Sequence, residues 1–350
     1  MAAKSSIIVW FRADLRLHDN PALYAAVSHG DRIIPVYIHA PREEAQWQPG
    51  AASHWWLHHS LSSLGRDLKQ RGSRLILRTG NSLNQLQQLV EQTGATAVYT
   101  TRCYSPASLE RDNKIQKALG TADIEFALYN GNLLVEPDNI HNKAGLPFKV
   151  FTPYWRTHQQ QFSLPGLLAA PDRLPAVPTR LSSTALGKLE LLPRLPWDKG
   201  LRETWQVGEQ AALDMLQTHT TEIIAAYPAT HDRPDIDGTS LLSPYLHFGE
   251  LSARQVARTL MQLQRGKTAQ AGAAALLRQL VWRDFAHHIL WHFPVTTDKP
   301  FDARYDRFPW QRRSNSRLLK AWQQGRTGSV SYTHLTLPTT IELCRSRWSP

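Results

Sequence analysis

The chain has 350 residues, enough for two domains, and its 42% hydrophobic and 20% charged residues exclude intrinsic disorder. No apolar run is long enough to span a membrane, and two cysteines cannot form a disulfide framework or a cysteine-rich zinc site. The N-terminus meets charge too soon for a secretory segment, so we expect a cytoplasmic protein. The net charge of +11 favours a polyanionic partner such as nucleic acid, which would place the protein at the nucleoid when bound to DNA.

Short apolar runs alternate with amphipathic segments in the first part of the chain. The pattern predicts strands at 7–11, 32–38, 74–77 and 97–99, and helices at 22–27, 55–70, 82–94 and 108–119. Asp19 or Asn20 is expected to cap the first helix, with Pro21 at its first position. Because strands that alternate with helices form parallel sheets, residues 5–135 are predicted to be an α/β domain with a Rossmann-like sheet.

The remaining chain changes character twice. Residues 136–200 contain prolines at six positions from 165 to 196 and are predicted to be an interdomain connector. Helical periods at 208–227, 252–264 and 271–292 predict an all-α domain over 201–328. The last residues, 329–350, are rich in Thr and Leu and lack a helical pattern, so we expect a non-native tail there.

Three hydroxyl side chains, those of Thr239, Ser240 and Ser243, fall within five residues, immediately before Pro244. Hydroxyls and backbone amides at the start of a helix can hold a phosphate without a basic side chain. A helix cap requires only one of these hydroxyls, so phosphate binding and simple capping are both open interpretations.

The helix predicted at 271–292 has two different faces. One face is an apolar stripe made of Leu277, Leu280, Val281, Phe285 and Ile289. Gln279, Trp282 and Arg283 lie on the other face, where an amide, an indole and a guanidinium could stack on a base and hydrogen-bond it. The alternative is a half-buried Trp beside a solvated Arg.

Basic and aromatic residues are interleaved near the end of the second domain. They are Arg304, Arg307, Phe308, Trp310, Arg312, Arg313 and Arg317. This stretch is compatible with phosphate contacts or with a merely solvated face. Two pairs of adjacent histidines, 58–59 and 287–288, point about 100° apart on a helix, so no metal site is expected from them.

Three segments, in order, resemble the photolyase and cryptochrome family. They are VWFRADLRLHDNPAL at 9–23, DGTSLLSPYLHFGELS at 237–252 and WRDF at 282–285, within a similarity that runs from about 7 to 328. The chain is most similar to bacterial class I photolyases for cyclobutane pyrimidine dimers. The resemblance implies a monomer with an antenna domain and a helical FAD domain, in which light-excited FAD passes an electron to a dimer in ultraviolet-damaged DNA.

The resemblance also implies roles for particular residues. The implied FAD contacts are Tyr227, Thr239, Ser240, Leu241, Leu242, Ser243 and, at the flavin edge, Arg283. The implied DNA contacts are His231, Gln279, Trp282 and Arg283. Trp282 would stack against the flipped lesion, and Trp310 would be the surface end of an electron relay. The family usually has Arg at positions 231 and 241, and dimer photolyases often have Glu at position 279.

Several alternatives stay open at this point. A cryptochrome photosensor would use the same flavin, and Gln279 leaves room for a (6-4) photolyase. The antenna chromophore could be methenyltetrahydrofolate or an 8-hydroxy-deazaflavin, because residues 104–108 lack the Asn-Glu pair of folate-binding members. The family continues after Gly328 with a different sequence, so we expect a C-terminally shortened chain that binds FAD weakly or not at all and whose own repair activity is open.

Overall fold

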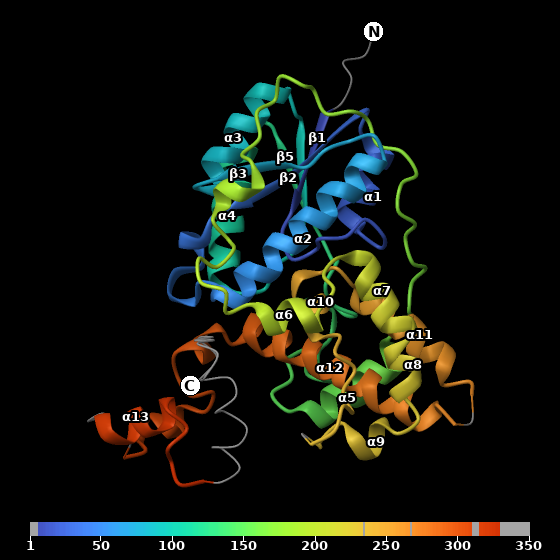
Figure 1. The fold of residues 1–350 in the computed structure, drawn as a ribbon, viewed down its shortest axis with the longest axis vertical. Helices are drawn as coiled ribbons and strands as arrows, with labels where there is room; N and C mark the ends of the chain where they lie inside the picture. Colours follow the sequence, from blue (N-terminus) through green and yellow to red (C-terminus); the bar gives the residue numbers. More distant parts are fainter. Residues whose placement is uncertain (1–5, 234, 267, 310–314, 330–350) are drawn as a thin grey trace.

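Five parallel strands form the N-terminal domain of the computed structural model, which describes residues 6–233, 235–266, 268–309 and 315–329 (Figure 1). The strands are β1 (Ser6–Phe11), β2 (Arg32–His39), β3 (Ile76–Thr79), β4 (Ala97–Thr101) and β5 (Glu125–Tyr129), in the order β3-β2-β1-β4-β5. The predicted Rossmann-like sheet is confirmed. Sequence reasoning missed β5, an edge strand with a single fully buried residue, because such a strand has only a weak apolar pattern.

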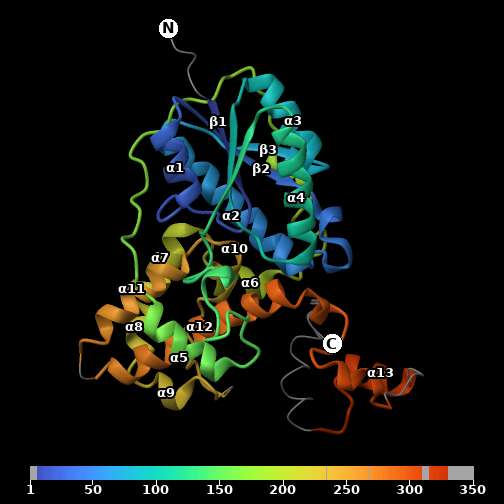
Figure 2. The same cartoon turned by 180° about the vertical axis from the view of Figure 1, so that it is seen from behind.

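Two helices cover each face of the sheet (Figures 1 and 2). They are α1 (Pro21–His29) and α2 (Ala51–Gln70) on one face, and α3 (Ser82–Thr93) and α4 (Pro106–Gly120) on the other. Alternate residues of β1 pack toward opposite faces: Ile7 and Val9 meet the α1 and α2 side, and Ile8 and Trp10 meet the α3 and α4 side. Asn20 caps α1, as predicted, by accepting a hydrogen bond of 3.0 Å from the backbone N–H of Leu23.

After β5 the described chain contains helices joined by irregular segments, and no further strand. The helices are α5 (Phe151–Gln161), α6 (Lys199–Thr204), α7 (Glu209–Gln217), α8 (His219–Ile223), α9 (Tyr227–Thr230), α10 (Ser243–Phe248), α11 (Ala253–Leu263), α12 (Gln270–His292) and α13 (Ser316–Gln323). The all-α prediction is confirmed for these residues, and none of their helices is long and apolar enough to cross a membrane. The expected tail lies outside the described residues, apart from Ser329.

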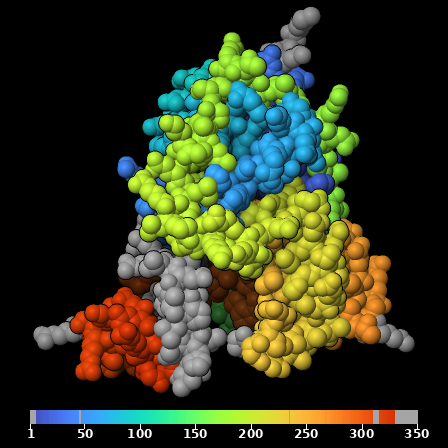
Figure 3. Space-filling model, viewed as in Figure 1, coloured from blue at the N-terminus to red at the C-terminus, as the bar shows by residue number. Residues whose placement is uncertain are grey.

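The predicted connector, 136–200, is only partly irregular. Its first part contains α5, which packs against α12 and contributes Phe151 and Tyr154 to the helical core. The later, proline-rich part runs over the surface beside α2 (Figure 3). Residues 136–161 are therefore better grouped with the helical domain than with a linker.

The single helix expected at 208–227 is instead divided into α7 and α8, with α9 beginning at Tyr227. The break falls at Thr218, whose hydroxyl donates a hydrogen bond of 2.6 Å to the carbonyl of Asp214. The hydroxyl of Thr221 donates to the carbonyl of Gln217 in the same way, at 2.6 Å. Such bonds from threonine to the preceding turn bend or interrupt helices, and helical periodicity alone does not reveal them.

The segment after β1 joins the two domains. The buried guanidinium of Arg16 donates hydrogen bonds to the carbonyls of Gly249 at 2.8 Å and of Gly131 at 2.7 Å. The carboxylate of Glu209 accepts hydrogen bonds from the backbone N–H groups of Leu17 and His18, both at 2.8 Å. The N-terminal signature segment thus holds α7 and the end of α10 against the sheet domain.

Candidate functional site

The long helix α12 presents its two predicted faces. Leu280, Val281 and Phe285 are buried in the helical core, while Gln279 is exposed. Trp282 is 42% exposed, which is unusual for so large an apolar ring. The predicted core stripe and the exposed positions of Gln279 and Trp282 are confirmed, whereas Arg283, expected on the same face, is half-buried.

Arg283 connects three parts of the molecule. Its guanidinium donates one hydrogen bond of 2.6 Å to the carbonyl of Asn132 and one of 3.4 Å to the carbonyl of Leu246 in α10. Burial lowers the pKa of Arg283, and the neighbouring Asp284 opposes that effect. In this structure Arg283 therefore fixes α10 and the sheet domain beside α12, while its predicted contact with the flavin edge stays a prediction.

Sequence reasoning missed Asp284, a carboxylate at a core-facing position of α12. Its Oδ2 accepts hydrogen bonds from the backbone N–H groups of Leu134 at 2.8 Å and Val135 at 3.1 Å. Burial is the main reason that the pKa of Asp284 rises to about 7. The available signal was the spacing, because Asp284 follows Leu280 and Val281 on the apolar stripe.

Asp284→Asn is expected to remove part of the pH dependence of stability. The pKa of about 7 in the folded chain returns to about 3.9 on unfolding, so the folded chain binds more protons between these values. This group therefore makes the free energy of unfolding fall as pH rises from about 4 to about 7. Urea unfolding measures the free energy of unfolding at pH 5 and at pH 7. Between these two values it should fall by about 1–2 kcal/mol more in the original chain than in Asp284→Asn. Equal losses in the two proteins would contradict this role.

The hydroxyl segment lies between α9 and α10. Thr239 and Ser243 are exposed and Ser240 is half-buried. The N-cap of α10 is Leu242, with no side-chain cap hydrogen bond, so the capping interpretation of the hydroxyls is wrong. Within the described part of the chain, the three hydroxyls form no hydrogen bond, while the carbonyl of Thr239 accepts one of 3.0 Å from His219 Nε2.

Leu242 anchors this segment in the core, and Leu241 sets the direction of its backbone. Leu242 is 2% exposed and belongs to the helical core. Leu241 has a φ of +55°, a left-handed conformation that is uncommon for a branched residue and that clusters at ligand sites. The backbone of the segment thereby turns sharply between the half-buried Ser240 and the exposed Ser243.

Tyr227 and His231 form a stacked pair on α9 and its C-terminal end. Their ring centroids lie 4.8 Å apart with planes at 17°, and His231 Nδ1 donates a hydrogen bond of 2.7 Å to the carbonyl of Tyr227. The helix that carries this pair, α9, also packs against α12. Each predicted site residue that the structure describes thus lies on or between α9, α10 and α12.

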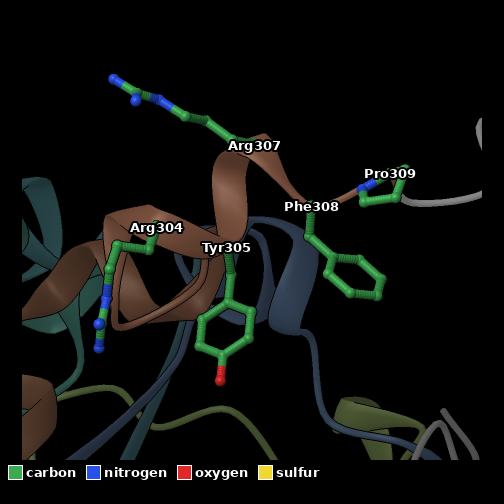
Figure 4. Close-up of a pocket in the computed structure, with 5 residues that line it drawn as sticks. All are labelled: Arg304, Tyr305, Arg307, Phe308 and Pro309. Carbon is green, nitrogen blue, oxygen red and sulfur yellow. The ribbon is translucent and has the colours of Figure 1, made fainter.

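The basic and aromatic stretch is only partly described. Arg304, Tyr305, Arg307, Phe308 and Pro309 line a shallow cavity of about 450 Å³, with Arg307 pointing away from Tyr305 and Phe308 (Figure 4). Arg304 pairs with Asp302 at 2.5 Å, which offsets its charge. Trp310, Arg312 and Arg313 lie outside the described residues, so the relay position predicted for Trp310 stays a prediction.

The sheet domain offers two further places for a ligand. At the carboxyl edge of β1, Arg12 donates to both oxygens of Asp112, at 2.7 and 2.8 Å, and stacks 4.6 Å from the ring of Trp10, so these side chains fill the edge. A cavity of about 620 Å³ lies instead between α2 and the connector, where His54, His58 and Trp197 are among its lining residues. No three His, Cys, Asp or Glu residues of the described chain gather as a metal site.

Comparisons with known proteins agree with this layout. The family model "DNA photolyase" matches residues 7–178, and the model "FAD binding domain of DNA photolyase" matches residues 276–330. The chain is 37% identical to the deoxyribodipyrimidine photo-lyase of Agrobacterium fabrum over 92% of this chain and 66% of that protein. It is 34% identical to cryptochrome-1 of Sinapis alba over 94% of this chain and 67% of that protein.

A solved structure is similar throughout the described fold. The crystal structure of a class III photolyase from Agrobacterium tumefaciens superimposes with a TM-score of 0.85 at 36% identity. The match covers 93% of this chain and 66% of the other. The present chain therefore spans 66% of the length of each of these two Agrobacterium proteins.

Proposed function

The chain belongs to the photolyase and cryptochrome family, and from that premise we propose that it serves light-driven repair of cyclobutane pyrimidine dimers in DNA. The outer face of α12 carries this proposal, because Trp282 is 42% exposed there, one turn after the exposed amide of Gln279. The enzyme would be a carbon–carbon lyase, deoxyribodipyrimidine photo-lyase. The match to a class III enzyme favours that subclass over the class I resemblance of the motifs.

FAD is the cofactor of this proposal, and when bound it supplies the light-excited electron that splits the dimer. The hydroxyls of Thr239, Ser240 and Ser243 fit the FAD phosphates, since they are unpartnered within the described chain and flank the left-handed turn at Leu241. Tyr227 would pack against the cofactor from α9. Arg283 would contact the edge of the flavin from α12, with its guanidinium held by the carbonyl groups of Asn132 and Leu246.

Damaged DNA is the proposed partner, bound by a cytoplasmic monomer. A dimer must leave the duplex stack, at a cost of a few kcal/mol that damage itself reduces. Stacking on the free face of Trp282 would offset that cost, with Gln279 and His231 near the lesion and its strand. The net charge of +11 supports attraction to the phosphate backbone.

An antenna chromophore is proposed for the cavity between α2 and the connector. Its volume of about 620 Å³ is suitable for a small cofactor, and His54, His58 and Trp197 give it aromatic and polar walls. The carboxyl edge of β1 is less suitable, because the Arg12–Asp112 pair fills it. Both methenyltetrahydrofolate and an 8-hydroxy-deazaflavin stay as proposals for this cavity.

Dimer-selective DNA binding tests the proposal. The chain should bind a short duplex with one cyclobutane thymine dimer about tenfold more tightly than the undamaged duplex. Both affinities should fall steeply with added salt, because phosphate contacts release counterions. Equal affinity for the two duplexes would refute the repair function and favour a cryptochrome photosensor, while a preference for a (6-4) photoproduct would assign the other lesion.

A further inference from the structure

Phe151, the first residue of α5, lies directly against Trp282. The two ring centroids are 3.5 Å apart and the ring planes differ by 11°. Aromatic pairs usually have centroids 4.5–7 Å apart, in offset or edge-to-face arrangements, so this pair is unusually close and parallel. Phe151 therefore covers one face of the Trp282 indole, and the 42% of Trp282 that stays exposed leaves the opposite face for a ligand.

Other side chains hold Phe151 in place. It is 4% exposed and meets Phe285 nearly edge-on, with 5.7 Å between centroids and an interplanar angle of 66°. Trp155, one turn further along α5, lies parallel to Phe151 at 6.3 Å and 14°. The guanidinium of Arg278 approaches the ring of Phe151 to 5.7 Å. These contacts fix the orientation of the Phe151 ring, and the Trp282 indole, stacked on that ring, takes nearly the same orientation.

An exposed tryptophan without such support would change rotamer freely, and ordering it on binding would cost conformational entropy. The stack on Phe151 fixes the indole before a ligand arrives. We propose that Phe151 is a positioning residue for lesion recognition, which sets the plane of Trp282 so that its free face receives the flipped pyrimidine pair. This inference rests on the proposed function, in which Trp282 stacks on the lesion.

The test compares the affinities of the full chain for a dimer-containing duplex and for the same undamaged duplex. Phe151→Leu should lower the ratio of the two affinities about fivefold, because the indole loses its fixed plane. Phe151→Tyr keeps the ring and should restore the ratio to within about twofold of the unchanged chain. Phe151→Met also removes the ring but keeps a long apolar side chain in the core. It should lower the ratio as Phe151→Leu does, and it serves as the ringless variant if Phe151→Leu folds poorly.

Phe148→Leu is the matched control, since Phe148 is 6% exposed in the same core and packs edge-on to Tyr154. It should lower the melting temperature comparably and leave the affinity ratio unchanged. A ratio unaffected by both Phe151→Leu and Phe151→Met, or lowered equally by Phe148→Leu, would overturn the positioning role. If the ratio of the unchanged chain were already one, the proposed function itself would fail, and the inference with it.

Discussion

Trp282→Ala is expected to remove most of the preference for dimer-containing DNA. Stacking of one base on an aromatic side chain contributes about 1–3 kcal/mol, so the affinity for the damaged duplex should fall about tenfold or more. Affinity for the undamaged duplex should change less than about twofold, because an intact stack does not offer its bases to the indole. Titration of both duplexes at one salt concentration gives the two values.

A second exposed tryptophan controls for the loss of an aromatic surface in general. Trp47 is 63% exposed on the 3₁₀ turn Pro41–Trp47 of the sheet domain. Trp47→Ala should leave both affinities unchanged. Similar losses for Trp47→Ala and Trp282→Ala, or equal losses on both duplexes, would show that Trp282 does not recognise the lesion.

Gly249→Ala is expected to disrupt the joint between the two domains. Gly249 has a φ of +71°, and a Cβ built there would lie 1.9 Å from the carbonyl oxygen of Ala13. Both the left-handed backbone and the contact with another backbone segment oppose any side chain at this position. We expect the free energy of unfolding to fall by about 4 kcal/mol or more, with a decrease of about 10 °C in melting temperature.

Gly65→Ala, within α2, is the control, because the same substitution is expected to stabilise the chain there. A Cβ at Gly65 meets nothing within 4 Å, and the residue lies in the interior of a helix. Alanine should therefore stabilise the chain by about 0.5–1 kcal/mol. A Gly249→Ala chain that melts at the same temperature as Gly65→Ala would contradict the close packing of α10 on the segment after β1.

Local patterns in the sequence were sufficient for four of the five strands of the sheet domain and for the two faces of α12. Buried runs such as Ile7–Phe11 and the Asn20–Pro21 cap specify their own conformation, so they could be recognised without the fold. The joint could not be predicted in this way. Arg16 and Gly249 are 233 positions apart, and nothing near Arg16 in the sequence identifies its partner.

In the candidate site, too, features within one segment could be predicted from the sequence, and contacts between distant segments could not. The cluster of hydroxyls at 239–243 could be predicted from the sequence, and so could the exposed position of Trp282. Each depends on residue spacing within a single segment. The contact of Phe151 with Trp282 depends on how α5 packs against α12, and α5 was placed within a connector. Its signal was present, since residues 151, 155, 158 and 162 are all aromatic or His at helical spacing, but Pro153 and the run of glutamines obscured it.

Flipping of the dimer against Trp282 can be measured directly with a fluorescent base. 2-Aminopurine placed opposite a cyclobutane thymine dimer is quenched while stacked and brightens when its partner leaves the helix. Saturating amounts of the chain should raise this fluorescence for the damaged duplex and leave the undamaged duplex unchanged, and Trp282→Ala should abolish most of the rise. Unchanged fluorescence of the damaged duplex at saturation would show that the chain does not extrude the lesion, which would contradict this account.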